Sequence, residues 1–128
     1  MEFNRIHVMG RVFSWIQRQG GVKKMAENAD KKSGILYDVI EKSNGFYVCP
    51  VEKSFRSRMN VPYRIGSATG DDALEKDFLA GAKSLKMLQL AGHRSVGGIR
   101  ASLYNAVTIE DVEALAKYMT EFYQNHKK

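Results

Sequence analysis

The residues with the clearest chemical potential lie in one segment, residues 92–105, which reads Gly-His-Arg-Ser-Val-Gly-Gly-Ile-Arg-Ala-Ser-Leu-Tyr-Asn. His93 and Arg94 are adjacent, and Arg100 follows Arg94 by six positions, beyond the pair Gly97-Gly98. A guanidinium matches phosphate and carboxylate with paired donors, and a neighbouring imidazole adds another donor. The spacing predicts two anion clamps: His93 with Arg94 for a phosphate, and Arg100 for a carboxylate.

The same residue types also have a plainer interpretation. A glycine pair between strands often only makes a turn, a surface arginine often only adds solubility, and a lone histidine is often structural. Arg58 and Arg64 alternate with apolar residues, so we interpret them as solvated or ion-paired rather than catalytic. Cys49, the single cysteine, is interpreted as a buried strand residue, and no Cys/His cluster for zinc is present.

The first half of the chain is predicted to hold two helices and two strands. Residues 5–18 have apolar side chains at helical spacing, and a glycine pair at 20–21 ends that helix. A second helix over residues 22–43 is either continuous or broken at Ser33-Gly34. Residues 46–49 are aromatic and β-branched, and residues 58–65 alternate between apolar and polar, so both are predicted strands.

The second half is predicted as helix, strand, strand and helix. A helix begins at Asp71-Asp72, short strands follow at residues 87–90 and from Ile99, and the last helix begins at Thr108 with a shortened capping box to Asp111. The order ααββαββα predicts an α+β two-layer sandwich, in which helices cover a small, mostly antiparallel sheet. Residues 1–128 are predicted to form a single domain.

The composition is that of an ordinary globular domain. Of 128 residues, 44% are hydrophobic and 27% are charged. No run approaches the ~20 apolar residues of a membrane helix, and residues 1–6 lack the apolar core of a secretory signal, so we expect a cytoplasmic protein. The net charge of +6 permits anionic partners. A dense basic run or an aromatic RNA-binding motif is missing, so nucleic-acid binding is only a third hypothesis.

Residues 92–106 resemble the C-terminal signature of phosphoserine aminotransferases. Other blocks resemble the same family in the same order and spacing: Val8-Met9-Gly10 with Trp15-Ile16, Gly45-Phe46-Tyr47-Val48, and residues 56–65. The resemblance covers about residues 4–128. It implies the small C-terminal domain of a fold-type I enzyme that uses pyridoxal phosphate and forms homodimers.

The resemblance also implies a substrate class and roles for the site residues. The family moves an amino group between glutamate and 3-phosphohydroxypyruvate, giving phosphoserine and 2-oxoglutarate in serine biosynthesis. By motif, His93 and Arg94 would bind the substrate phosphate, and Arg100 would bind the α-carboxylate. The cofactor's lysine, its aspartate and its stacking aromatic come from the large N-terminal domain of the family, and no segment here resembles that domain.

We therefore assign no catalytic or cofactor-binding residue and expect no covalent pyridoxal phosphate on this chain. Two functional hypotheses follow, and whether the chain is itself an enzyme is left open. The first is the substrate-recognition domain of the transaminase, inactive alone. The second is a regulatory fragment that pairs with a complete subunit and modulates its dimer. In either case, the exposed apolar residues of the first helix would favour self-association of the isolated chain.

Overall fold

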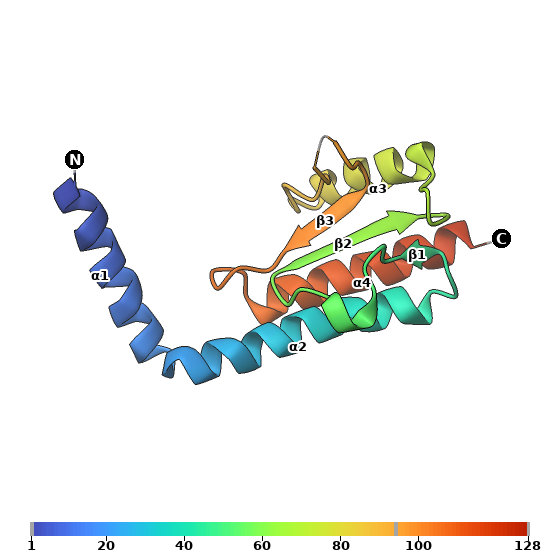
Figure 1. Ribbon diagram of the computed structural model, residues 1–128. Helices are drawn as coiled ribbons and strands as arrows, with labels where there is room; N and C mark the ends of the chain where they lie inside the picture. Colours follow the sequence, from blue (N-terminus) through green and yellow to red (C-terminus); the bar gives the residue numbers. More distant parts are fainter. Residues whose placement is uncertain (1, 94, 128) are drawn as a thin grey trace.

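The computed structural model describes residues 2–93 and 95–127, with side chains from residue 4 onward (Figure 1). The described residues form one three-stranded antiparallel sheet of order β1-β2-β3, with helices before, between and after the strands. The predicted α+β class is confirmed. The elements are α1 (Glu2–Arg18), α2 (Gly21–Lys42), β1 (Tyr47–Val48), the 3-10 turn η1 (Lys53–Phe55), β2 (Asn60–Ile65), α3 (Asp72–Ser84), β3 (Ile99–Ser102) and α4 (Ile109–His126).

The core lies between the sheet and the helices α2 and α4, which run side by side beneath it (Figure 1). Successive strand residues point to opposite faces. In β2 the residues Val61, Tyr63 and Ile65 are buried, and in β3 Ile99 and Ala101 are buried, so one face of the sheet covers the helices. The alternation predicted for residues 58–65 is therefore confirmed.

An aromatic cluster joins α3 and α4 to the sheet. The Tyr63 and Phe78 rings lie 6.1 Å apart and perpendicular, and the Phe78 and Phe122 rings lie 5.1 Å apart at 83°. Tyr47 meets Tyr63 edge-on at 5.7 Å. Edge-to-face contacts of this kind add to the stabilisation from burial of the rings. The cluster fixes α3 beside β2, and α3 in turn borders the glycine-rich segment described below.

Helix α1 projects away from this core (Figure 1). The predicted helix over residues 5–18 is confirmed, yet its apolar side chains are exposed; they include Ile6, Val8, Met9, Val12 and Phe13. The backbone turns between α1 and α2 at Gly20, where φ is 102°. The apolar face of α1 therefore lies outside the core of this domain.

Helix α2 is unbroken, and the segment between α3 and β3 differs from the prediction. Helix α2 is continuous through Ser33-Gly34, and the Ser33 hydroxyl donates to the Ala29 carbonyl at 2.9 Å, which keeps the polar side chain within the helix. The predicted strand at residues 87–90 was wrong. Lys86 and Gln89 have φ of 63° and 64°, and this left-handed backbone breaks an extended run. The order is therefore ααββαβα, with a lone bridge between Ala91 and Ile99.

The predicted starts of α3 and α4 were correct. Asp71 caps α3 by accepting from the backbone N–H groups of Ala73 and Leu74. Thr108 caps α4 in a full capping box: its hydroxyl accepts from Asp111 N at 3.1 Å, and the Asp111 carboxylate accepts from Thr108 N at 2.9 Å. These bonds lower the pKa of the Asp111 carboxyl. Across the described part of the chain, each helix is too short or too polar to span a bilayer.

Candidate functional site

In the glycine-rich segment, residues 91–93 and 95–99 form a tight loop that leads into β3. Ala91 bridges Ile99 at its base, and Gly92 N donates to Gly98 O at 2.8 Å. Inside the loop, Gly97 N donates to His93 O at 2.8 Å. Gly97 and Gly98 have φ of 71° and 72°, a conformation that side chains with a Cβ rarely adopt. The glycine pair therefore closes the loop and sends the chain back along β2.

His93 lies at the start of this loop and is exposed to solvent. Its Nδ1 lies 2.7 Å from the Ser95 hydroxyl, which orients the ring. Among the described residues, no partner bonds its Nε2. That nitrogen is therefore available to a ligand. Arg94, predicted to act with His93, lies outside the described residues, so its role stays a prediction.

Arg100 stands on the second residue of β3, opposite Pro62 of β2, and its side chain is exposed. It points to the face of the sheet opposite the buried Ile99 and Ala101, as the alternation predicted. Its backbone N donates to Leu90 O at 2.8 Å, so the strand is held on both sides. Among the described residues, no carboxylate pairs with its guanidinium.

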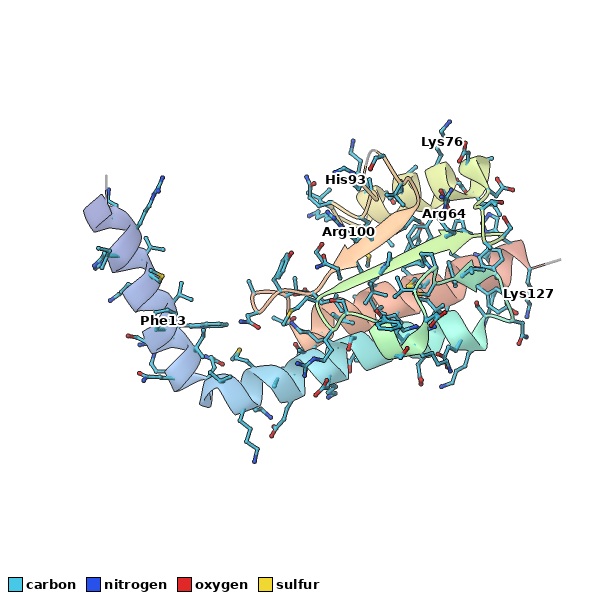
Figure 2. The ribbon with its side chains drawn as sticks, in the orientation of Figure 1. Phe13, Arg64, Lys76, His93, Arg100 and Lys127 are labelled. Atoms are coloured by element: carbon cyan, nitrogen blue, oxygen red, sulfur yellow. The ribbon has the colours of Figure 1, made fainter. Side chains whose placement is uncertain are left out.

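His93 and Arg100 are thus carried by one loop-and-strand unit, and they lie in the same part of the molecule (Figure 2). Arg100 also lines a cavity of about 560 Å³ beside β3. The cavity wall consists of residues 85–91, residues 100–103 and, at the start of α4, Val107, Asp111, Val112, Ala114 and Leu115. His93 is not among the residues that line this cavity, so the cavity adjoins Arg100 alone of the two.

Arg64 is a residue that the sequence analysis did not connect with this loop. Its Nε donates to Glu75 Oε1 at 2.8 Å, and its Nη1 donates to the Val96 carbonyl at 3.2 Å (Figure 2 labels Arg64). Glu75 also accepts from the backbone N of Ile65 at 3.2 Å. The prediction that Arg64 is ion-paired is confirmed, and its partner lies on α3. The signal available in the sequence was a basic residue near the end of the predicted strand and an acidic residue eleven positions later, in the predicted helix.

Comparison with known proteins identifies the family. The model of the family Aminotransferase class-V matches residues 2–115. The chain belongs to this aminotransferase family. It is similar to phosphoserine aminotransferase of Drosophila melanogaster, with 63% identity over 122 residues, and to a probable phosphoserine aminotransferase of Caenorhabditis elegans, with 50% identity over 121 residues. These matches cover 95% and 94% of the chain but 34% and 33% of the relatives.

Solved structures of class-V aminotransferases agree with this result. The phosphoserine aminotransferase of Bacillus circulans subsp. alkalophilus superposes with a TM-score of 0.83 at 39% identity, over 88% of this chain and 30% of that one. The PLP-bound enzyme of Trichomonas vaginalis gives 0.79 at 36% identity, over 86% and 31%. The resemblance to phosphoserine aminotransferases is confirmed. The chain spans about a third of the length of the curated relatives it matches.

The cofactor of this aminotransferase family, pyridoxal phosphate, needs a lysine amine that can bond to it. Lys32 is buried, and burial lowers the pKa of its amine, with Asp111 opposing the effect. A lowered lysine pKa is the usual mark of a reactive amine. Here, however, the amine donates to three carbonyls, those of Leu103, Tyr104 and Val107, at 3.1, 2.9 and 2.8 Å. Lys32 therefore does not fit the cofactor role.

The other described lysines are exposed and lie on helices or turns away from the cavity beside β3, apart from Lys86 on its rim. The described residues also hold no group of three or more His, Cys, Asp or Glu side chains placed for a metal ion. The anion-binding roles expected of His93, Arg94 and Arg100 stay predictions.

Proposed function

We propose that this chain is the substrate-recognition domain of a phosphoserine:2-oxoglutarate aminotransferase in serine biosynthesis, and that it is inactive alone. The observation that carries the proposal is the pair of exposed side chains, His93 and Arg100, on one loop-and-strand unit in a chain of this family. His93 and Arg94 bind the substrate phosphate. Arg100 binds the α-carboxylate that phosphoserine and glutamate share.

Separate sites for the two anions explain how one domain serves two substrates. Glutamate has the α-carboxylate but no phosphate, so it uses Arg100 without the His93-Arg94 pair. Phosphoserine uses both. A charge-assisted hydrogen bond contributes about 1.5–3 kcal/mol when water is excluded, but exposed charges are screened and contribute much less. Because His93 and Arg100 are exposed here, we expect weak binding by the isolated chain and tight binding when another domain covers the site.

The same reasoning accounts for inactivity of the isolated chain. Pyridoxal phosphate supplies the electron sink for amino transfer when it is bound. Lys32, the buried lysine of the described residues, is fully engaged with backbone carbonyls. The task of this domain is to bind and orient the substrate, and we propose that the rest of a complete subunit, in a homodimer, supplies the cofactor site.

A chimera tests the recognition roles. The chain replaces the matching third of the Drosophila melanogaster relative, and KM is measured for two amino donors, phosphoserine and glutamate. Arg100→Ala is expected to raise both KM values, by about 10- to 100-fold for the loss of one charged contact. Arg94→Ala is expected to raise the phosphoserine value much more than the glutamate value. Equal losses for both donors in Arg94→Ala would contradict the assigned roles.

Arg58→Ala is the matched control in that chimera. Arg58 forms an exposed ion pair with Asp30 at 3.1 Å, remote in sequence from the loop, so both KM values should stay within about twofold of the parent.

The isolated chain is tested separately by reduction with borohydride after addition of pyridoxal phosphate. A stable adduct of one cofactor per chain at a single lysine would overturn the proposal that the chain lacks its own cofactor site.

A second function is favoured by one observation, the exposed apolar face of α1. A free domain with such a face could pair with a complete subunit and modulate its dimer. Adding the purified chain in excess to the complete Drosophila melanogaster relative tests this. Dose-dependent loss or gain of activity supports modulation, and unchanged activity at high excess counts against it.

A further inference from the structure

We infer that Arg64 and Glu75 are positioning residues that hold the loop carrying His93, and that they thereby set the selectivity for the phosphorylated substrate. The inference rests on the proposed function of that loop. Neither residue is assigned a contact with substrate. Both act through the backbone of residues 95–98, which Arg64 reaches at the Val96 carbonyl.

The contacts of Arg64 connect three separate segments. Its Nε and Nη2 donate to the two carboxylate oxygens of Glu75 on α3, at 2.8 and 3.4 Å, while Nη1 donates to Val96 O at 3.2 Å in the loop. The pair is well shielded, with side-chain exposures of 18% for Arg64 and 8% for Glu75. A two-point carboxylate pair restricts the guanidinium to one plane. The loop carbonyl is therefore bound by a donor of fixed position.

The glycines around Arg64 show how closely the loop approaches it. A Cβ on Gly98 would lie 2.6 Å from Arg64 Cδ and 3.1 Å from the Tyr63 carbonyl. A Cβ on Gly70, before α3, would overlap the guanidinium itself. A Cβ contact under 3.0 Å would require a neighbour to move. Arg64 cannot easily move away, because its guanidinium is bonded to Glu75 and to the Val96 carbonyl. Gly98 and Gly70 thus form a slot for Arg64, which gives the diglycine segment a second purpose besides closing the loop.

Charge separates the roles of Arg64 and Arg100. The guanidinium of Arg64 is neutralised by Glu75 and has three N–H bonds directed at protein acceptors, so it is a poor competitor for a substrate anion. Arg100 has no such partner among the described residues. Arg100 is also fixed independently, by the β2 ladder and by its bond to Leu90. Loss of Arg64 should therefore displace the phosphate clamp and leave the carboxylate clamp in place.

The first experiment needs no enzymatic activity and uses this chain. Amide hydrogen exchange is measured at Gly92 and Gly97, whose N–H groups bond within the loop, in Arg64→Gln and Arg64→Lys. We expect exchange at both amides to become at least about tenfold faster in Arg64→Gln, with unchanged protection in the middle of α4. Arg58→Lys is the control for altering an ion-paired arginine. Unchanged loop protection in a folded Arg64→Gln chain would overturn the inference.

The second experiment uses the chimera and compares phosphoserine with glutamate. Arg64→Lys keeps a charge opposite Glu75 but loses the forked contact, and it should raise the phosphoserine KM about tenfold while the glutamate KM stays within twofold. A variant that only folds less well would lower kcat for both donors and leave both KM values unchanged, which would overturn the inference. Glu75→Gln should reproduce the KM split, since it frees the same guanidinium.

The Arg94→Ala chimera distinguishes failure of the proposed function from failure of the positioning role of Arg64. If Arg94→Ala discriminates between the donors and Arg64→Lys does not, the proposed function holds and the positioning role is wrong. If Arg94→Ala itself affects both donors equally, the loop is not the phosphate clamp, and both the proposed function and the inference built on it fail. Discrimination by both variants supports both.

Discussion

Replacement of Lys32 by methionine should strongly destabilise this domain. Lys32 lies in the middle of α2, its side chain is buried, and its amine donates to the carbonyls of Leu103, Tyr104 and Val107. These carbonyls belong to the turn between β3 and α4. Methionine has a similar length and keeps the apolar packing of the stem, but it offers no donor to that turn.

The size of the effect follows from two destabilising contributions and one that opposes them. Hydrogen bonds to a charged donor contribute about 1.5–3 kcal/mol each, and a buried acceptor left unpaired costs about 1–3 kcal/mol. Tyr104 is 58% exposed, so its carbonyl can recover a bond to water, whereas Leu103 is 2% exposed. Removal of the buried charge relieves the desolvation that lowers the Lys32 pKa. We expect a net loss of about 2–4 kcal/mol in the free energy of unfolding.

Urea unfolding of the purified chain measures this loss. Lys31→Met is the matched control, because Lys31 is the adjacent lysine and is exposed. It should change the free energy of unfolding by less than about 0.5 kcal/mol. The m-value should be the same in both variants if the denatured states are alike. A Lys32→Met chain as stable as Lys31→Met would show that the three carbonyl bonds only compensate for burial of the amine.

Four further outcomes are expected. Thr108→Ala removes the capping box of α4 and should cost about 1 kcal/mol in urea unfolding. Tyr47→Phe loses the hydrogen bond to Met119 O at 2.8 Å and should lower the free energy of unfolding by about 1 kcal/mol. Tyr63→Phe should leave it unchanged, because among the described residues the buried Tyr63 hydroxyl has no partner. Burial raises the pKa of both phenols. Above about pH 10 the unfolded chain therefore releases phenol protons that the folded chain keeps. The free energy of unfolding should fall by up to about 1.4 kcal/mol per pH unit for each phenol, and this fall should be less steep in Tyr47→Phe. Phe13→Glu should reduce self-association in sedimentation, and an already monomeric parent chain would refute the role given to α1.

Much of the fold could be predicted because its signals are local. The capping box at Thr108 and the alternation in β2 depend on residues a few positions apart, and both were correct. The false strand at residues 87–90 had an apolar run but no local sign of its two left-handed residues, Lys86 and Gln89. Lys86 directly follows the C-cap of α3, and the N–H groups of Lys86 and Met87 bond back to the carbonyls of Lys83 and Ala82, so its left-handed backbone ends that helix. Glycine is the usual residue at such a position, and a lysine there gave no signal of it.

The candidate site was predictable only in part, for the same reason. The types and spacing of His93 and Arg100 predicted anion recognition, and the structure carries both on one loop-and-strand unit. The support of that loop could not be predicted. Arg64 and Val96 are 32 positions apart, and Lys32 is 71 positions from Leu103, so no local pattern links them. Such pairs depend on the packing of α2, α3 and the sheet.

Two cations of this domain, Arg64 and Lys32, have a structural task that the proposed ligand-binding residues do not share. Arg64 and Lys32 are buried or nearly so, and their donors are directed at a carboxylate and at backbone carbonyls. They bond to the backbone before and after Arg100, Arg64 at Val96 in the loop that begins with His93 and Lys32 at Leu103 after β3. A ligand-binding cation must keep its donors free, so it cannot also hold its own loop. Because distant residues carry that task, Arg100 has no carboxylate partner among the described residues, and the Nε2 of His93 has none there either.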